Sequence, residues 1–175
     1  PLVAELTIAG PVAATVQRVT LDNFAELRAL PEAAQWREQL RVLESRVCGL
    51  HDALRLLMAE RRAQGRVREC HGDLHCGNVV RWTGELTPFD GIEFDPALRY
   101  IDVVNDIAFL AMDLAERGHS ELRRAVLQAW VETLGDWDGL PLLPYYEAYR
   151  ALVRAKVAAL RALQLAPETP ARGAA

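Results

Sequence analysis

This sequence contains almost no lysine and no glycine-rich phosphate-binding loop. Lys156 is the only lysine among 20 basic residues, and neither G-x-G-x-x-G nor G-x-x-x-x-G-K-[ST] occurs. Loops of these kinds hold nucleotide phosphates through backbone N–H groups, helped by a lysine. The chain also begins at Pro1 rather than at a methionine. Its 175 residues therefore carry no complete phosphate-binding loop of their own.

Strong charge, patterned cysteines and long apolar runs are lacking as well. The net charge of −4 and the pI near 5.6 give no basic footprint for nucleic acid. No apolar run approaches the ~18 residues that indicate a membrane span, and no secretory signal is visible. Cys48, Cys70 and Cys76 are odd in number and unpatterned, which favours a reducing cytoplasm over a disulfide framework. With 51% hydrophobic residues, the chain can bury one sizeable core.

The stretch richest in chemistry begins at Cys70. His71, Asp73 and Asn78 fit H-x-D-x-x-x-x-N, the loop pattern of kinase-type phosphoryl transfer. Such a reaction needs a residue that orients or receives the proton of the attacking hydroxyl, and Asp73 suits this task. Because Asp, Asn and Gly are common in turns, the same residues also fit an ordinary turn.

A second acid, Asp90, follows the loop after a short hydrophobic stretch. Residues 79–82 and 86–89 are predicted to form two strands joined by the three-residue loop 83–85. In that register Asn78 faces Asp90, with Cβ atoms about 4.5–5.5 Å apart. Mg²⁺ takes one or two such oxygen ligands from protein and completes its shell with phosphates and water.

Three segments together resemble the aminoglycoside-phosphotransferase-like family, which has a kinase-like fold. They read HGDLHCGNVV…FDGIEF, YIDVVNDIAFLAMDL and YRALVRAKVAALRALQ. The similarity is greatest to a bacterial branch of uncharacterised phosphotransferases that are often fused to a P-loop kinase domain. It extends over residues 23–164 and is most specific over residues 71–106.

The resemblance implies a role for each residue of the motif. Asp73 would be the catalytic base, and His71 would brace the loop. Asn78 and Asp90 would hold Mg²⁺ and, through it, the phosphates of ATP. His75 stands where protein kinases commonly have a lysine, and it is a further candidate catalytic residue.

Other acids near the motif have more open interpretations. By the resemblance, Asp102 would support the loop from the start of a helix, with Asp106 one turn further on the same face. Glu93 is either a substrate or metal ligand or a solvated turn residue. The excess of acids over residues 90–116 predicts a local field that attracts cations. The cysteines and histidines of residues 70–76 also suggest zinc, although their spacing matches none of the usual zinc motifs.

The predicted fold is mainly α with a small β-hairpin (α+β), corresponding to the C-terminal lobe of a kinase-like fold without its N-lobe. Residues 1–30 form an N-terminal remnant with a short helix over 23–30 that Asp22 caps, and residues 166–175 form a linker or tail. Residues 31–165 form the lobe itself, with the catalytic loop at 71–78 and the metal-site hairpin at 79–90. The other elements expected are a strand at 67–69, helices at 36–64, 100–118 and 141–165, and a helix through residue 134 that Ser120 caps.

Two side-chain patterns support this organisation. An apolar stripe with heptad spacing from Trp36 to Leu57 fits a core helix better than a coiled-coil dimer, because only about three heptads are present. Tyr145, Tyr146 and Tyr149 are expected in the core rather than beside a substrate cleft.

Two functions follow from this reading. The first is ATP- and Mg²⁺-dependent phosphorylation of a hydroxyl on a small molecule by a cytoplasmic protein, of which this chain is the C-lobe, with weak or absent ATP binding on its own. The partners expected are the missing N-lobe and, as in the fused members of the family, a P-loop domain, with no nucleic acid and no membrane. The alternative is a non-catalytic helical module, a kinase remnant that binds or regulates a partner.

Overall fold

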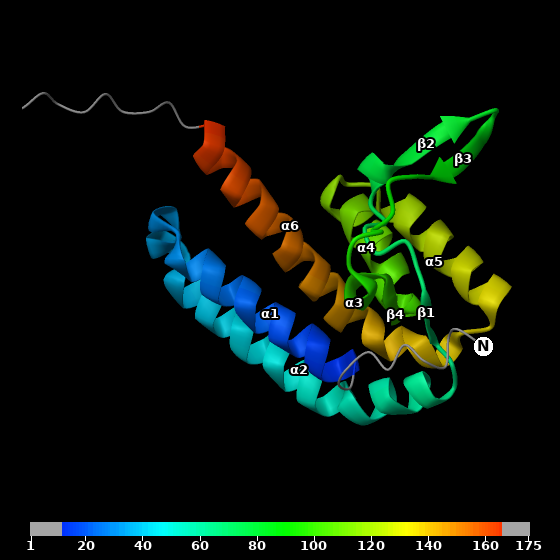
Figure 1. The fold of residues 1–175 in the computed structure, drawn as a ribbon, viewed down its shortest axis with the longest axis horizontal. Coiled ribbons are helices and arrows are strands. Elements are labelled where there is room, and N and C mark those ends of the chain that lie inside the picture. The colour runs from blue at the N-terminus through cyan, green and yellow to red at the C-terminus, as the bar shows by residue number, and fades with distance from the viewer. Residues whose placement is uncertain (1–11, 166–175) are drawn as a thin grey trace, which may run out of the picture.

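The computed structural model describes residues 12–165, which form a helical protein with two small two-stranded sheets (Figure 1). The mainly α fold with a small β component is confirmed. Within the described residues, no helix is both long and apolar enough to cross a membrane. The elements in chain order are α1 Val12–Ala29, η2 Pro31–Trp36, α2 Arg37–Ala63, β1 Val67–Glu69, η3 Cys76–Asn78, β2 Val79–Trp82, β3 Glu85–Pro88, α3 Pro96–Arg99, β4 Tyr100–Asp102, α4 Val103–Glu116, α5 Ser120–Leu134, η4 Trp137–Leu142 and α6 Leu143–Leu165.

Helix α1 is longer than the sequence pattern predicted. The expected helix over 23–30 with Asp22 as its cap is wrong, because α1 already begins at Val12. Asp22 lies inside this helix and pairs with Arg18, 3.3 Å away and one turn earlier. The buried residues Val16, Asn23 and Phe24 continue one helical face past Asp22, so no boundary occurs there. Residues 1–11 of the predicted N-terminal remnant, and the predicted tail at 166–175, lie outside the described residues.

Helix α2 confirms the predicted long helix, but only part of the predicted stripe, including Val47, faces the core. Its buried residues are Val47, His51, Met58 and Arg61, while Trp36, just before the helix, is 55% exposed. A strict heptad stripe drifts around a straight helix that has 3.6 residues per turn. The buried face therefore leaves the predicted stripe and takes in His51 and Arg61.

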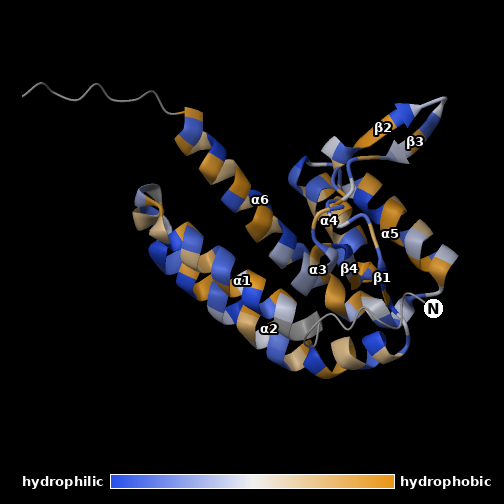
Figure 2. Cartoon of the chain, viewed as in Figure 1, coloured by the Kyte–Doolittle hydropathy of each residue, from blue (hydrophilic) through white to orange (hydrophobic). Residues whose placement is uncertain are grey.

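The core lies where α1, α2 and α4 pack against α6. Tyr145, Tyr146 and Tyr149 are at most 5% exposed, which confirms them as core residues. The Tyr145 hydroxyl lies 3.1 Å from Nδ1 of His51, which joins α6 to α2. Hydrophobic and hydrophilic residues alternate around α1, α2, α5 and α6, as expected for amphipathic helices that bury one face (Figure 2).

The residues before α4 are extended rather than helical. Tyr100–Asp102 was predicted to open a helix, but it forms strand β4 and pairs antiparallel with β1. The side chain of Asp102 then caps α4 by accepting the N–H of Val104 at 2.9 Å. The predicted strand at Val67–Glu69 is confirmed as β1. The pairing brings the start of the predicted catalytic loop beside the start of α4.

Two predicted helix starts are also displaced. Ser120 is the first residue of α5 and not its cap, a position that His119 takes without a side-chain hydrogen bond. Helix α6 begins at Leu143, because Pro141 belongs to the 3-10 helix η4 that joins α5 to α6.

The hairpin forms with a register one residue away from the prediction. Its turn has two residues, Thr83 and Gly84, with φ of 48° and 93°. Positive φ at both turn positions is the pattern of a tight type I′ turn, which lets the strands pair one residue earlier. Trp82 therefore pairs with Glu85 instead of Leu86. At the open end, the Phe89 N–H donates to the Asn78 carbonyl at 3.0 Å, so Asn78 does not face Asp90 directly.

Candidate catalytic loop and acidic cavity

The loop of residues 70–78 is anchored to one face of α4. The carboxylate of Asp106 accepts the backbone N–H of His71 at 3.0 Å and that of Gly72 at 2.9 Å. Two helical turns further on, Asp113 accepts the N–H of Cys76 at 2.9 Å. Residues seven apart lie on the same helix face, so α4 holds both ends of the loop.

Asp102 was predicted to brace this loop, and the structure corrects that assignment to Asp106. The carboxylate of Asp102 binds the guanidinium of Arg61 instead, with Nε at 2.8 Å and a second nitrogen at 2.9 Å. The strand β4 keeps Asp102 one helical turn ahead of the loop-facing position. Asp102 still supports the structure, but it does so at the cap of α4.

Arg61 and two carboxylates form a buried cluster behind β4. Arg61 also donates to Asp136 at 2.6 and 2.7 Å, and the side chains of all three residues are at most 2% exposed. The hydrogen bonds from Arg61 hold the pKa of Asp136 below its usual value, although burial opposes this. Gly139 leaves room for the cluster, since a Cβ there would lie 3.0 Å from Nη1 of Arg61 and 3.0 Å from Oδ2 of Asp136. The cluster therefore joins α2, β4 and the segment after α5.

Gly72 occupies a position that only glycine fits. Its φ is +81°, and a Cβ would lie 2.8 Å from the carbonyl oxygen of Leu98. Its own carbonyl accepts a hydrogen bond from the guanidinium of Arg150 at 2.9 Å. The chain thus turns sharply just before Asp73 and directs that side chain outward.

Asp73 is partly exposed and surrounded by hydrogen-bond donors. The Nδ2 atom of Asn78 donates to Oδ2 of Asp73 and to its backbone carbonyl, both at 3.0 Å. Nε2 of His75 lies 3.5 Å from the same Oδ2. Nδ1 of His75 accepts the N–H of Gly77 at 3.0 Å, so a neutral His75 carries its proton on Nε2, facing Asp73.

His71 connects the loop to the end of the hairpin. Its Nδ1 accepts the N–H of Asp73 at 3.3 Å, and its Nε2 lies 2.8 Å from the Phe89 carbonyl. Its backbone carbonyl accepts the N–H of Ile92 at 2.9 Å. These contacts hold the segment after the hairpin, which includes Asp90, beside Asp73.

Asp73 and Asp90 line the same open cavity, which has a volume of about 810 Å³. Asp90 has a φ of 60°, an uncommon value for a residue with a side chain. The remaining lining comes from Gly91, Ile92, Glu93 and Phe94. The structure therefore brings Asp73, Asp90 and Glu93 together at one surface, with Asn78 bonded to Asp73 immediately behind it.

The oxygen atoms at this site fit a magnesium ion that takes most of its ligands from nucleotide phosphates and water rather than from protein. Within residues 12–165, no three His, Cys, Asp or Glu side chains are arranged to hold a metal. Asn78 uses its nitrogen on Asp73, which leaves Oδ1 as the atom that can bind a cation. One or two protein oxygens are the usual share for Mg²⁺ on a nucleotide. The Cys70 thiol is directed to the Ile101 carbonyl, with Sγ 3.7 Å from that oxygen, and burial raises its pKa to about 12.

The prediction that the acids of residues 90–116 together attract cations is wrong for most of these acids. Asp102, Asp106 and Asp113 are used inside the protein by Arg61, by the loop backbone, and by Cys76 and Arg117. Asp95 caps α3 by accepting the N–H of Ala97 at 2.9 Å. The acids at the cavity are Asp73, Asp90 and Glu93.

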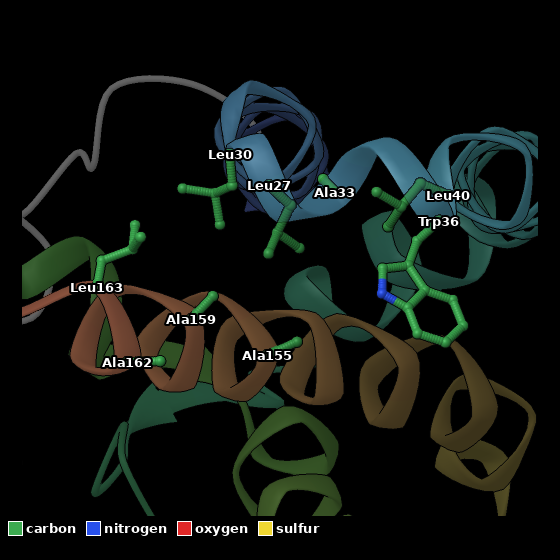
Figure 3. A pocket seen from close by; sticks show the side chains of 9 residues that line it. All are labelled: Leu27, Leu30, Ala33, Trp36, Leu40, Ala155, Ala159, Ala162 and Leu163. Carbon is green, nitrogen blue, oxygen red and sulfur yellow. The ribbon is translucent and has the colours of Figure 1, made fainter. Parts of the chain in front are cut away.

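A second cavity has a different character. It is an apolar groove of about 430 Å³ between the end of α1, η2, the start of α2 and the outer half of α6. Figure 3 shows Leu27, Leu40 and Leu163 among the side chains around it. The side chains that line this groove offer no acid, base or nucleophile, so the candidate chemistry lies at the loop.

Sequence reasoning missed several residues that build the site. Asp113 and Arg150 hold the loop, while Asp136 completes the cluster that anchors β4. The seven-residue spacing of Asp106 and Asp113 on one apolar helix was the available signal for a polar face. Arg150 and Asp136 had no such signal, because their partners are distant in the sequence.

The chain is similar to uncharacterized mycobacterial proteins. It is 35% identical over 162 residues to the uncharacterized protein Rv2004c of Mycobacterium tuberculosis (strain ATCC 25618 / H37Rv). The uncharacterized protein Mb2027c of Mycobacterium bovis matches with the same identity and length. Each match includes 93% of this chain and 32% of the relative, so the chain spans about a third of the length of these curated relatives. No family model and no solved structure matches the chain.

Proposed function

We propose that this chain is the catalytic lobe of a cytoplasmic, ATP- and Mg²⁺-dependent phosphotransferase that acts on a hydroxyl of a small molecule. One observation carries the proposal. Asp73 and Asp90 meet at one open cavity, while Asn78 is bonded to Asp73 behind it. The resemblance to the aminoglycoside-phosphotransferase-like family supports the same reaction, but it does not indicate which acceptor is phosphorylated.

Each residue of the loop has a task in this reaction. Asp73 orients the acceptor hydroxyl and receives its proton, with Asn78 and His75 positioning the Asp73 carboxylate. His71 holds Asp90 beside Asp73 through the Phe89 and Ile92 backbone. Asn78 and Asp90 are the residues that would hold Mg²⁺. That ion would bridge the phosphates of ATP and neutralise charge that develops on them.

Glu93 is the candidate substrate contact. It lies on the cavity beside Asp90, and it is exposed. A carboxylate there favours an acceptor that carries a positive charge near its hydroxyl. The N-lobe that would supply a glycine loop and a lysine belongs to the longer protein in this proposal, as would a fused P-loop domain.

The test uses that longer protein with Mg–ATP and a panel of hydroxylated small molecules, and it measures ADP release. Asp73→Asn and Asp90→Asn should each lower kcat by about 10²–10⁴-fold, the usual contribution of a positioned acid or base. The matched control Asp52→Asn changes an exposed acid on α2 and should leave kcat unchanged. Thermal unfolding shows whether each variant is folded. Full activity in both folded site variants would refute the proposal.

The alternative is a non-catalytic helical module, and the missing glycine loop and lysine favour it. Calorimetry with Mg–ATP separates the two functions when it is done on both forms of the protein. The enzyme hypothesis predicts that the longer protein binds Mg–ATP and that residues 1–175 alone bind it weakly or not at all. A longer protein that does not bind Mg–ATP favours the binding module.

A further inference from the structure

A buried cation lies directly beneath the candidate catalytic loop. Arg150 on α6 is 5% exposed, and its guanidinium lies 4.9 Å from the ring centre of Phe109 and 5.2 Å from that of Tyr149. Its Nε donates to Oδ1 of Asn105 at 2.7 Å and more weakly to the Asn105 carbonyl at 3.3 Å. The side chain therefore has fixed partners on several sides, and its orientation is determined by packing.

The remaining hydrogen bond of this guanidinium goes to the loop. A terminal nitrogen of Arg150 donates to the Gly72 carbonyl at 2.9 Å, across 78 residues of sequence. On the other side of the same residue, Asp106 accepts the Gly72 N–H at 2.9 Å. The N–H belongs to the peptide before Gly72, and the carbonyl belongs to the peptide that links Gly72 to Asp73. Both peptide planes around the glycine are thus held by charged side chains, one from α4 and one from α6.

These two contacts matter because glycine has no side chain to restrict its backbone. A φ of +81° is open to Gly72, but other conformations are open to it too. Rotation of the peptide between Gly72 and Asp73 would redirect the Asp73 carboxylate. A charge-assisted hydrogen bond to that carbonyl opposes the rotation.

We propose that Arg150 is a positioning residue, which holds the Gly72 carbonyl and thereby aims Asp73 at the cavity. Its effect on turnover rests on the proposed function, whereas its effect on the loop does not. Burial disfavours the charged form and lowers the pKa of Arg150, while nearby Tyr149, Asp106 and Asp73 favour the charge. A guanidinium remains protonated throughout the neutral pH range.

The first measurement is hydrogen exchange of the backbone amides of residues 71–78, made on the present chain. Arg150→Met keeps an unbranched side chain but removes the donors, and it should speed exchange in the loop at least tenfold. Arg123→Met is the matched control, because Arg123 also joins α6 through two bonds, to Glu147 at 2.9 and 3.1 Å. The control should leave loop exchange unchanged. Arg150→Lys keeps the charge but not the fork of donors, and it should give an intermediate value.

The second measurement is steady-state kinetics in the longer protein, with Mg–ATP as donor and water as acceptor. Arg150→Met should lower kcat at least tenfold and leave KM for Mg–ATP within threefold, with partial rescue by Arg150→Lys. A general loss of structure would lower the folded fraction, and it would not lower kcat selectively while leaving KM unchanged. An equal change in the Arg123→Met control would overturn the positioning role.

Different results would overturn the role of Arg150 and the proposed function. Loop exchange that stays at the wild-type rate in a folded Arg150→Met variant overturns the inference. If that variant does not fold, an Arg150→Lys variant with wild-type exchange and wild-type kcat overturns it instead. A wild-type protein that turns over no ATP, either with water or with the panel of hydroxylated small molecules as acceptor, refutes the proposed function, while the exchange data still decide whether Arg150 holds the loop.

Discussion

The carboxylate of Asp106 accepts the backbone N–H of Gly72 over 2.9 Å, although 34 residues separate them in the sequence. The same carboxylate accepts the N–H of His71 at 3.0 Å. A side chain on a rigid helix therefore supplies the hydrogen bonds that the loop backbone lacks in secondary structure. This arrangement lets a glycine-containing loop keep one conformation.

Replacing Gly72 with alanine should lower the unfolding free energy far more than the same change at Gly65. Both glycines have positive φ, +81° and +73°, so alanine is strained by about 1 kcal/mol at either position. A Cβ at Gly72 also lies 2.8 Å from the Leu98 carbonyl, whereas nothing lies within 4 Å of one at Gly65. Urea denaturation of the two variants measures the difference. Equal loss of unfolding free energy in both would contradict the close approach at Gly72.

Loss of Arg61 should be among the most damaging single changes in the chain. Arg61→Met leaves the carboxylates of Asp102 and Asp136 buried without their partner. Breaking a buried ion pair in this way costs about 3–5 kcal/mol of unfolding free energy. The control Arg41→Met removes an exposed pair with Glu38, which solvent screens, so its effect on the unfolding free energy should be small. Chemical denaturation measures both variants, and similar losses in the two would contradict the prediction.

His51 should make the stability of the protein fall on mild acidification. Burial beside Tyr145 lowers the pKa of His51 in the folded state, while nearby Asp52 opposes the shift. Between the folded and unfolded pKa values only the unfolded chain binds the proton. The contribution of neutral His51 to stability is therefore complete above about pH 6.5, and it is lost as the pH falls through the pKa of His51 in the folded state.

The measurement is the unfolding free energy of the wild-type protein and of His51→Gln at pH 7.5 and 5.0. The wild type should lose more stability than the variant, by about 1.4 kcal/mol for each unit by which the pKa is lowered. Comparing the two proteins removes the contributions of the other histidines, which they share. Parallel losses in both proteins would show that His51 does not titrate differently on folding.

The hairpin shows how far local reasoning reaches. The residue types located the first strand correctly and the second to within one residue, but the turn has two residues instead of the predicted three. The register was wrong by one residue, because it depends on whether Thr83 and Gly84 adopt positive φ together. A slip of one residue changes every partner in the ladder. Asn78 and Asp90 therefore do not face each other as predicted, although Asp90 still lies on a cavity with Asp73.

The side chains that hold the loop could not be identified from local sequence patterns. A helix carrying Asp102, Asp106 and Asp113 was predicted, but periodicity alone did not show which acid faces the loop. The pairing of β1 with β4 sets where α4 begins, and that start decides the direction of each acid. Similarly, Arg150 was one more charged residue on a predicted helix.

The sequence by itself determined helices α2, α4, α5 and α6 and strands β1, β2 and β3 to within a few residues, together with the core tyrosines and the loop that carries His71, Asp73 and Asn78. These features follow from neighbours within a few turns, whose periodicity and turn preferences are written in consecutive residues. Only the tertiary structure decided that Asp106 and Arg150 hold Gly72, and that Arg61 joins Asp102 to Asp136. Those pairs are separated by 34 to 78 residues, and the packing of whole helices brings them within hydrogen-bonding distance.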